Sequence, residues 1–173
     1  MRATTCLTLL CMLAVPALGQ QPAMPAFSPQ TLAAVEAAVT AARQEIEHLN
    51  IDILNIKYSD GKDIEYYKQL LNLQLRIAAD NVRVLKEIDS LTSAVLLSQA
   101  LAGLREAMRD LTSVLQNAGE NATSAAPVRA AIPLVRAYKA LDQPSSAFDE
   151  QLLTIIKAAD SALNMPRRRT PAN

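Results

Sequence analysis

The stretch from Ser28 to Ile56, SPQTLAAVEAAVTAARQEIEHLNIDILNI, decides the fold class of this 173-residue chain. Its apolar residues recur at alternating spacings of three and four, the a and d pattern of a helix that packs against other helices. Ser28 suits the N-cap and Pro29 the first helical position. The pattern predicts a coiled-coil-like helix about 40 Å long. Its seam consists of Leu32, Val35, Val39, Ala42, Ile46, Leu49, Ile53 and Ile56.

A short turn follows this helix, and a second helix follows the turn. Asp60-Gly61 is a strong turn signal within the segment 58–62, and Asp63 is suited to cap the second helix. A connection this short predicts an antiparallel αα-hairpin. The second helix carries two apolar rows, which indicates that it packs against more than one partner. The first row is Tyr66, Leu70, Leu73, Ile77, Val84 and Ile88, and the second is Ile64, Tyr67, Leu71, Leu75, Ala78, Val82 and Leu85.

Two features interrupt this part of the chain. Asp80-Asn81 breaks the first row, which indicates either a polar patch at the surface or a buried polar pair that sets the register or binds something. Between Asp89 and Ser93 the apolar phase shifts, with no proline or glycine present. The chain therefore either continues as one helix from Asp63 to Gln116 or bends near Ser90. We expect a break, because a helix of that length is unusual in a compact domain.

The C-terminal half predicts two further helices after a surface loop over residues 117–126. Pro127 suits the start of the fourth helix, and Pro133 is expected to kink it or to mark its true start. The segment 142–144 is expected to end this helix, and Ser145 or Ser146 to cap a fifth. The whole pattern predicts an all-α antiparallel bundle of four to five helices over residues 28–165. The segment 20–27 is expected to be an extended lead-in, and 166–173 a loose basic tail.

The first 19 residues have the three parts of a secretory signal peptide. Arg2 is followed by an apolar run from Cys6 to Val15, and the small residues Ala17 and Gly19 predict cleavage after Gly19. The run is too short to span a bilayer as a helix, which takes roughly 20 residues, although an uncleaved N-terminal anchor is the alternative. The predicted localisation is therefore outside the cytoplasm: extracellular, cell wall or periplasm, depending on the host.

Both cysteines, Cys6 and Cys11, lie in the segment predicted to be removed. The mature chain would then be free of cysteine, without disulfides, thiol catalysis or cysteine-based metal sites. The charges balance, with 17 basic and 17 acidic residues, and the only basic cluster is 167–169. This distribution argues against a nucleic-acid partner. We also expect no transmembrane helix in the mature chain.

Candidate chemical sites are few. His48, the only histidine, shares a helix face with Glu45 and Asp52. A carboxylate-bridged metal site would need a second Glu-x-x-His motif, which the chain lacks. His48 also falls on the solvent side of the heptad, so we predict an ordinary charged face, with no metal site, catalytic residue or cofactor.

Another candidate is a modification site. Asn121-Ala122-Thr123 is an N-glycosylation sequon in the predicted loop, meaningful in a host that glycosylates exported proteins. The arginines 167–169 are expected to be a solubilising end, the alternatives being a processing site or a contact with an anionic surface.

In layout, this exported, alanine-rich helical chain with few aromatics is similar to fungal hydrophobic-surface-binding proteins and cell-wall galactomannoproteins. The resemblance lies in composition and helix number, carries no diagnostic residues, and implies binding of hydrophobic surfaces or lipids. We expect a secreted, non-enzymatic protein that binds a partner protein or a surface outside the cell. The alternative is a carrier of lipid or another small hydrophobic molecule within the bundle.

Overall fold

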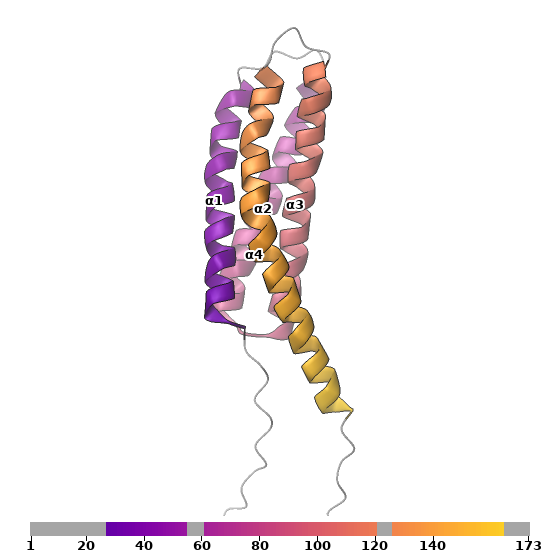
Figure 1. Cartoon of the computed structure of the whole chain (residues 1–173). Coiled ribbons are helices and arrows are strands. Elements are labelled where there is room, and N and C mark those ends of the chain that lie inside the picture. The colour runs from indigo at the N-terminus through magenta and orange to yellow at the C-terminus, as the bar shows by residue number, and fades with distance from the viewer. Residues whose placement is uncertain (1–26, 55–60, 121–125, 165–173) are drawn as a thin grey trace, which may run out of the picture.

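The computed structural model describes residues 27–54, 61–120 and 126–164 (Figure 1). Four helices occupy these ranges: α1 (Pro29–Leu54), α2 (Gly61–Glu87), α3 (Leu91–Glu120) and α4 (Ala126–Leu163). The described residues contain no strand. The predicted all-α helical bundle is therefore confirmed.

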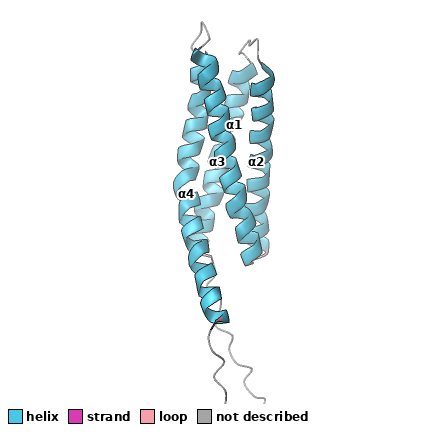
Figure 2. Ribbon diagram, turned by 90° about the vertical axis from the view of Figure 1, so that its right-hand side faces the viewer, coloured by secondary structure: helices cyan, strands magenta, loops and turns pink. Residues whose placement is uncertain are grey.

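The helices form a ring in which each one packs against two neighbours. α1 packs closely against α4, α2 against α3, and α3 against α4, whereas the α1–α2 contact is the loosest of the four. Successive helices run in opposite directions along one long axis, and the end of α4 extends past the end of the bundle where α1 begins (Figures 1 and 2). The predicted αα-hairpin of α1 and α2 is thus present, although each of its helices packs more closely against another neighbour.

The core lies along the axis of this ring. The predicted seam of α1 is buried from Val35 to Leu49, and the second apolar row of α2 is buried beside it, apart from the half-buried Tyr67. Burial of each large apolar side chain stabilises the fold by about 1.5–3 kcal/mol. The largest fully buried side chains are Phe148, Ile46, Leu49, Leu71, Leu85, Leu97, Leu101, Leu104, Met108, Leu111, Leu115 and Leu134.

The chain breaks between α2 and α3, as the phase shift at residues 89–93 predicts. The Ser93 backbone N–H donates a hydrogen bond of 3.1 Å to Ser90 Oγ, and the two hydroxyl oxygens are 2.8 Å apart. Ser90 is therefore the N-cap of α3, at the place where the sequence predicts a bend. The segment from Asp63 to Gln116 is two helices.

Two predicted helix boundaries are wrong. α2 begins at Gly61, so Asp63 lies inside the helix instead of capping it. α3 continues to Glu120, so residues 117–120 of the predicted loop are helical. Gly119 lies in close contact with α4, because a Cβ at this position would approach Val128 Cγ2 to 2.9 Å. The absence of a side chain at Gly119 permits this contact. Packing against α4 thus extends α3 beyond the point where its polar sequence predicts an end.

The predicted separation into a fourth and a fifth helix is also wrong, because α4 runs continuously through Pro133 and Pro144. Pro144 removes one backbone hydrogen bond, which normally disrupts a helix. Leu141 and Phe148 are both completely buried, so the core holds the helix on both sides of Pro144. The Ser145 hydroxyl caps no new helix and instead donates a hydrogen bond of 2.7 Å to the Leu141 carbonyl.

Candidate functional site

One of the two apolar rows of α2 remains at the surface of the bundle. Tyr66, Leu73, Ile77 and Ile88 are 61%, 51%, 37% and 59% exposed. Ile88 directly follows the helix, and its N–H still donates to the Val84 carbonyl at 2.8 Å, so it continues the helical geometry. Leu70 and Val84 are half-buried. We call these six residues the α2 apolar row: Tyr66, Leu70, Leu73, Ile77, Val84 and Ile88.

The helical geometry explains why this row is exposed. Ile77 directly precedes the fully buried Ala78, and Val84 directly precedes the buried Leu85. Consecutive residues point about 100° apart around a helix. The second row faces the bundle axis, and the α2 apolar row is therefore turned away from it. Both packing partners of α2, the helices α1 and α3, leave most of this row uncovered, although Leu70 packs against the core and Val84 is half-buried.

A residue of α3 extends the apolar surface. A Cβ on Gly103 would approach Gln74 Oε1 to 2.8 Å, which places Gly103 opposite Gln74 on the antiparallel α2. Leu96, seven residues before Gly103, lies on the same face of α3 and is 47% exposed. Since two turns back on α3 correspond to two turns forward on α2, Leu96 lies level with Asn81. Leu96 therefore borders the α2 apolar row.

The polar interruption of the row is a surface feature. Asp80 is exposed, and the half-buried Asn81 donates from its side-chain nitrogen to the Ile77 carbonyl at 2.9 Å. The alternative of a buried polar pair is therefore wrong. Asp80 and Glu87 each form an ion pair with Arg83, at 3.9 and 3.7 Å. These charges line the edge of the row that faces α1, and pairs this exposed contribute only about 0–1 kcal/mol each.

The start of the row carries a charge with a shifted pKa. Gln69 Nε2 donates to Glu65 Oε1 at 3.2 Å, and the Lys68 ammonium lies 3.4 Å from Glu65 Oε2. The Gln69 hydrogen bond, followed by the Lys68 charge, holds the pKa of Glu65 below its ordinary value. Glu65 thus places a carboxylate at the start of the row, next to the exposed ring of Tyr66.

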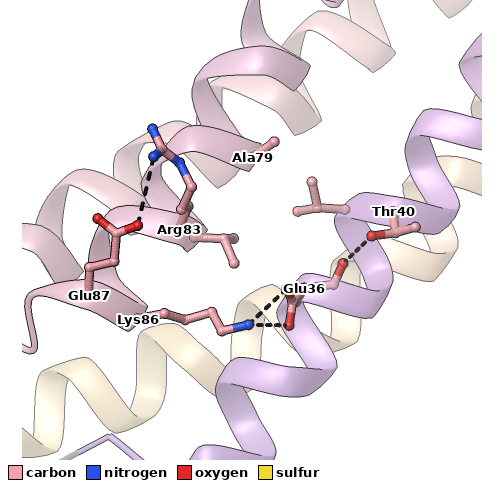
Figure 3. Close-up of a pocket in the computed structure, with 8 residues that line it drawn as sticks. Glu36, Thr40, Ala79, Arg83, Lys86 and Glu87 are labelled. Carbon is pink, nitrogen blue, oxygen red and sulfur yellow. Dashed lines mark hydrogen bonds and ion pairs between the residues drawn. The ribbon is translucent and has the colours of Figure 1, made fainter.

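A groove of about 420 Å³ opens between α1 and α2 (Figure 3). Val39 and Val82, both buried, belong to its lining. Lys86 reaches across the groove from α2, and its Nζ lies 3.0 Å from Glu36 Oε1 on α1. The two acidic and two basic side chains that line the groove balance one another in charge, so the groove does not favour a charged ligand. The lining residues are Glu36, Val39, Thr40, Ala79, Val82, Arg83, Lys86 and Glu87.

Two further grooves are open to solvent. One, of about 310 Å³, lies further along the α1–α2 contact and includes Arg43, Glu47 and Arg76 in its lining. The other, of about 400 Å³, lies between α3 and α4. In the latter, Arg109 donates a hydrogen bond of 2.8 Å to the Tyr138 hydroxyl and lies 5.3 Å from the ring centroid. This hydrogen bond raises the pKa of Arg109. All three grooves lie at helix–helix contacts of the surface and not inside the bundle.

A polar network between α3 and α4 is the feature that the sequence analysis missed. Arg105 forms ion pairs with Asp142 at 3.6 Å and with Asp149 at 3.5 Å, and Ser98 donates to Asp149 at 2.6 Å. Ser98 and Asp149 are 51 residues apart in the sequence, so no local motif marks this network. The two carboxylates flank Pro144 on either side, which gives the network a structural role in joining both halves of α4 to α3.

The candidate residues on α1 are not brought together into a site. His48 is exposed, as its heptad position predicts, and Glu45 is half-buried. The side chain of Asp52 lies outside the described residues. No group of three or more His, Cys, Asp or Glu residues suited to a metal ion occurs in the described part of the chain.

Several predictions concern residues that the structure does not describe. These are the signal peptide with its cleavage after Gly19, the cysteines Cys6 and Cys11, the sequon at Asn121 and the arginines 167–169. All of them stay predictions. Of the helices that are described, none combines the length and the apolar character needed to cross a membrane.

Comparison with known proteins gave no match among family models, curated proteins or solved structures. The resemblance in layout to fungal surface-binding proteins therefore gains no support from these comparisons. The α2 apolar row is the feature that remains as a candidate functional site.

Proposed function

We propose that this chain is a secreted, non-enzymatic binding protein whose α2 apolar row binds an amphipathic helix of a partner protein outside the cell. The observation that carries the proposal is the exposure of Tyr66, Leu73, Ile77 and Ile88 along one face of a helix whose other apolar row is buried. Exposed apolar side chains that follow one another along a helix are typical of interaction surfaces.

The shape of the row favours a helix as its occupant. From Tyr66 to Ile88 it extends about 33 Å at 1.5 Å per residue, and it is about one helix wide. Charges of both signs, Asp80, Arg83 and Glu87, line one edge. A flat hydrophobic surface would leave these charges against apolar material, whereas an amphipathic helix would meet the row with apolar residues and the edge with polar ones.

The non-enzymatic part of the proposal rests on the sequence. General acid–base chemistry would depend on His48 or on carboxylates that nothing singles out, and both cysteines lie in the predicted signal peptide. Secretion rests on that signal peptide alone. The carrier alternative requires an apolar volume inside the bundle, whereas the three grooves described above lie on its surface.

Site-specific photo-crosslinking in the native host tests the proposal. A photoreactive residue replaces Leu73 in one variant and Leu153 in another, because both leucines are 51% exposed and Leu153 lies on α4, outside the row. We expect a protein adduct from position 73 and none from position 153. The crosslinked partner segment should be an amphipathic helix, and a synthetic peptide of that segment should compete with the adduct.

Three results would overturn the proposal. Equal adducts at both positions would indicate non-specific contact, and the absence of any adduct at position 73 would leave the row without a partner. A lipid adduct at position 73 in place of a protein adduct would favour the carrier alternative.

A further inference from the structure

The α2 apolar row has a spacing that is the same in both directions along the helix. With Asn81 included, its positions are 66, 70, 73, 77, 81, 84 and 88, so the successive steps are 4, 3, 4, 4, 3 and 4. Ile77 is the centre of this pattern. An antiparallel copy of the same row therefore presents its side chains at matching levels.

Pairing two copies about Ile77 brings apolar residues together at nearly every level. Ile77 meets Ile77 of the second copy, Leu70 meets Val84, and Tyr66 meets Ile88. Leu73 meets Asn81, whose side-chain nitrogen already donates to the Ile77 carbonyl of its own helix. The second copy thus needs to supply no partner for that donor.

The two consecutive steps of four at the centre make the register centred on Ile77 the one that pairs all seven positions of the row. A strict heptad row matches itself after every shift of seven residues, so it defines no single antiparallel alignment. The extra step is a stutter that breaks this repetition. A shift of one heptad pairs fewer positions of the row: Ile77 then meets Val84 and Leu73 meets Ile88, whereas Tyr66 and Leu70 have no partner in the row of the other copy.

Charges at the edge of the row match the same register. In this pairing Asp80 of one copy lies about 3 Å along the axis from the level of Arg76 of the other copy. Asp80 and Arg76 occupy the same edge of α2, four residues apart, and an antiparallel two-fold pair places like edges together. The contact therefore forms twice, once on each side of the axis.

We propose, building on the function proposed above, that the partner helix is the α2 of a second copy of this chain, packed antiparallel about a two-fold axis at Ile77. The row covers about 33 by 12 Å, roughly 400 Å² on each copy. Stable interfaces bury about 800 Å² on each partner. Glu65 also lies near the level of Glu87 of the second copy, which opposes pairing. The dimer is consequently weak and in equilibrium with the monomer.

Cysteine crosslinking tests the register. The purified secreted protein, from which Cys6 and Cys11 have been removed with the signal peptide, receives Ile77→Cys, Tyr66→Cys, Ile88→Cys or the control Leu153→Cys. Disulfides form where Cα atoms lie about 4.4–6.8 Å apart. We expect Ile77→Cys to crosslink to itself at least tenfold faster than Leu153→Cys. Tyr66→Cys and Ile88→Cys should crosslink rapidly with each other in a mixture and slowly alone.

Two crosslinking results would overturn the proposal. One is a rate for Ile77→Cys no higher than that of Leu153→Cys. The other is faster crosslinking of Tyr66→Cys with itself than with Ile88→Cys, which would indicate a parallel pair.

Sedimentation equilibrium tests the association itself, at concentrations from roughly 1 μM to 1 mM. We expect a monomer–dimer equilibrium that Ile77→Asp abolishes and Leu153→Asp leaves within about twofold. Arg76→Asp should weaken the dimer about tenfold, and the further change Asp80→Arg should restore most of that loss. Denaturation of each variant verifies that the monomer still folds.

The outcomes separate the two proposals. A wild-type protein that stays monomeric throughout this range overturns self-pairing. The proposed function survives that result if the photoreactive residue at position 73 forms its adduct with a helix of another protein. The absence of any protein adduct at position 73 refutes the proposed function as well.

Discussion

The ring of Phe27 is stacked on the ring of Phe148, with the centroids 5.0 Å apart and the planes inclined by 17°. Phe27 precedes α1 by two residues, and Phe148 lies on α4, where it is completely buried. The stack joins the start of α1 to the C-terminal half of α4, after Pro144. It is thus one of the contacts that keep α4 a single helix.

Phe148→Ala is expected to destabilise the protein by about 3–5 kcal/mol, because it leaves a cavity at a fully buried site. Phe27→Ala should cost less, since Phe27 is only half-buried. Chemical denaturation followed by circular dichroism measures both values. Equal losses for the two variants would show that the stack, and not the burial of Phe148, dominates at this site.

Replacement of the two helical glycines should have unequal effects. A Cβ on Gly103 meets the flexible end of Gln74 at 2.8 Å, which is free to move, so Gly103→Ala should gain up to about 1 kcal/mol from helix propensity. A Cβ on Gly119 meets Val128 Cγ2 at 2.9 Å, and a β-branched side chain moves less easily. Gly119→Ala should therefore be neutral or destabilising. Thermal denaturation of both variants gives the comparison, and a larger gain at Gly119 would contradict it.

Pro144→Ala is expected to stabilise the protein by about 2 kcal/mol. The change restores a backbone hydrogen bond inside α4 and removes the clash of the proline ring with the preceding turn, which together are worth about 3 kcal/mol in a helix interior. It also increases the conformational entropy of the unfolded chain, which offsets roughly 1 kcal/mol of this stabilisation. Pro29→Ala is the control, because Pro29 is the first residue of α1, where proline costs little. Urea denaturation gives both values, and a loss of stability in Pro144→Ala would mean that α4 needs the proline.

Gln69→Ala should raise the pKa of Glu65 toward its ordinary value, because the Gln69 hydrogen bond is the main cause of its lowering. The folded-state pKa lies below the unfolded one, so this group stabilises the fold above the unfolded pKa. That contribution is lost as the pH falls through the folded pKa. An NMR titration of the Glu65 carboxyl resonance measures the shift. Lys68→Ala serves as comparison and should also raise the pKa of Glu65, because it removes both the Lys68 charge and the Lys68 hydrogen bond.

Local sequence patterns predicted the elements whose apolar residues form one regular row, and the break between two such rows. The heptad seam from Val35 to Leu49 is buried as predicted, because a regular a and d row has one face to turn inward. The phase shift near Ser90 correctly indicates a break, because one straight helix cannot turn two apolar rows of different phase toward the same core. The turn predicted at Asp60-Gly61 stays a prediction, because Asp60 lies outside the described residues and Gly61 is the first residue of α2.

Local patterns failed where distant contacts override them. Pro144 and the polar run before it predict the end of a helix, but Arg105 on α3 holds Asp142 and Asp149 on both sides of it. The side chains that oppose the break lie on another helix, so the sequence around Pro144 carries no sign of them. The same reason explains the extension of α3 to Glu120.

The sequence by itself determined that this protein is a bundle of long antiparallel helices and that α2 carries two apolar rows. Periodicity and turn residues encode these properties locally. Only the tertiary structure decided which row of α2 is buried in the core, because a helix in a ring of four turns one side toward the common axis. Leu71, Leu75 and Val82 occupy that side, and the α2 apolar row, about 100° away, remains for a partner.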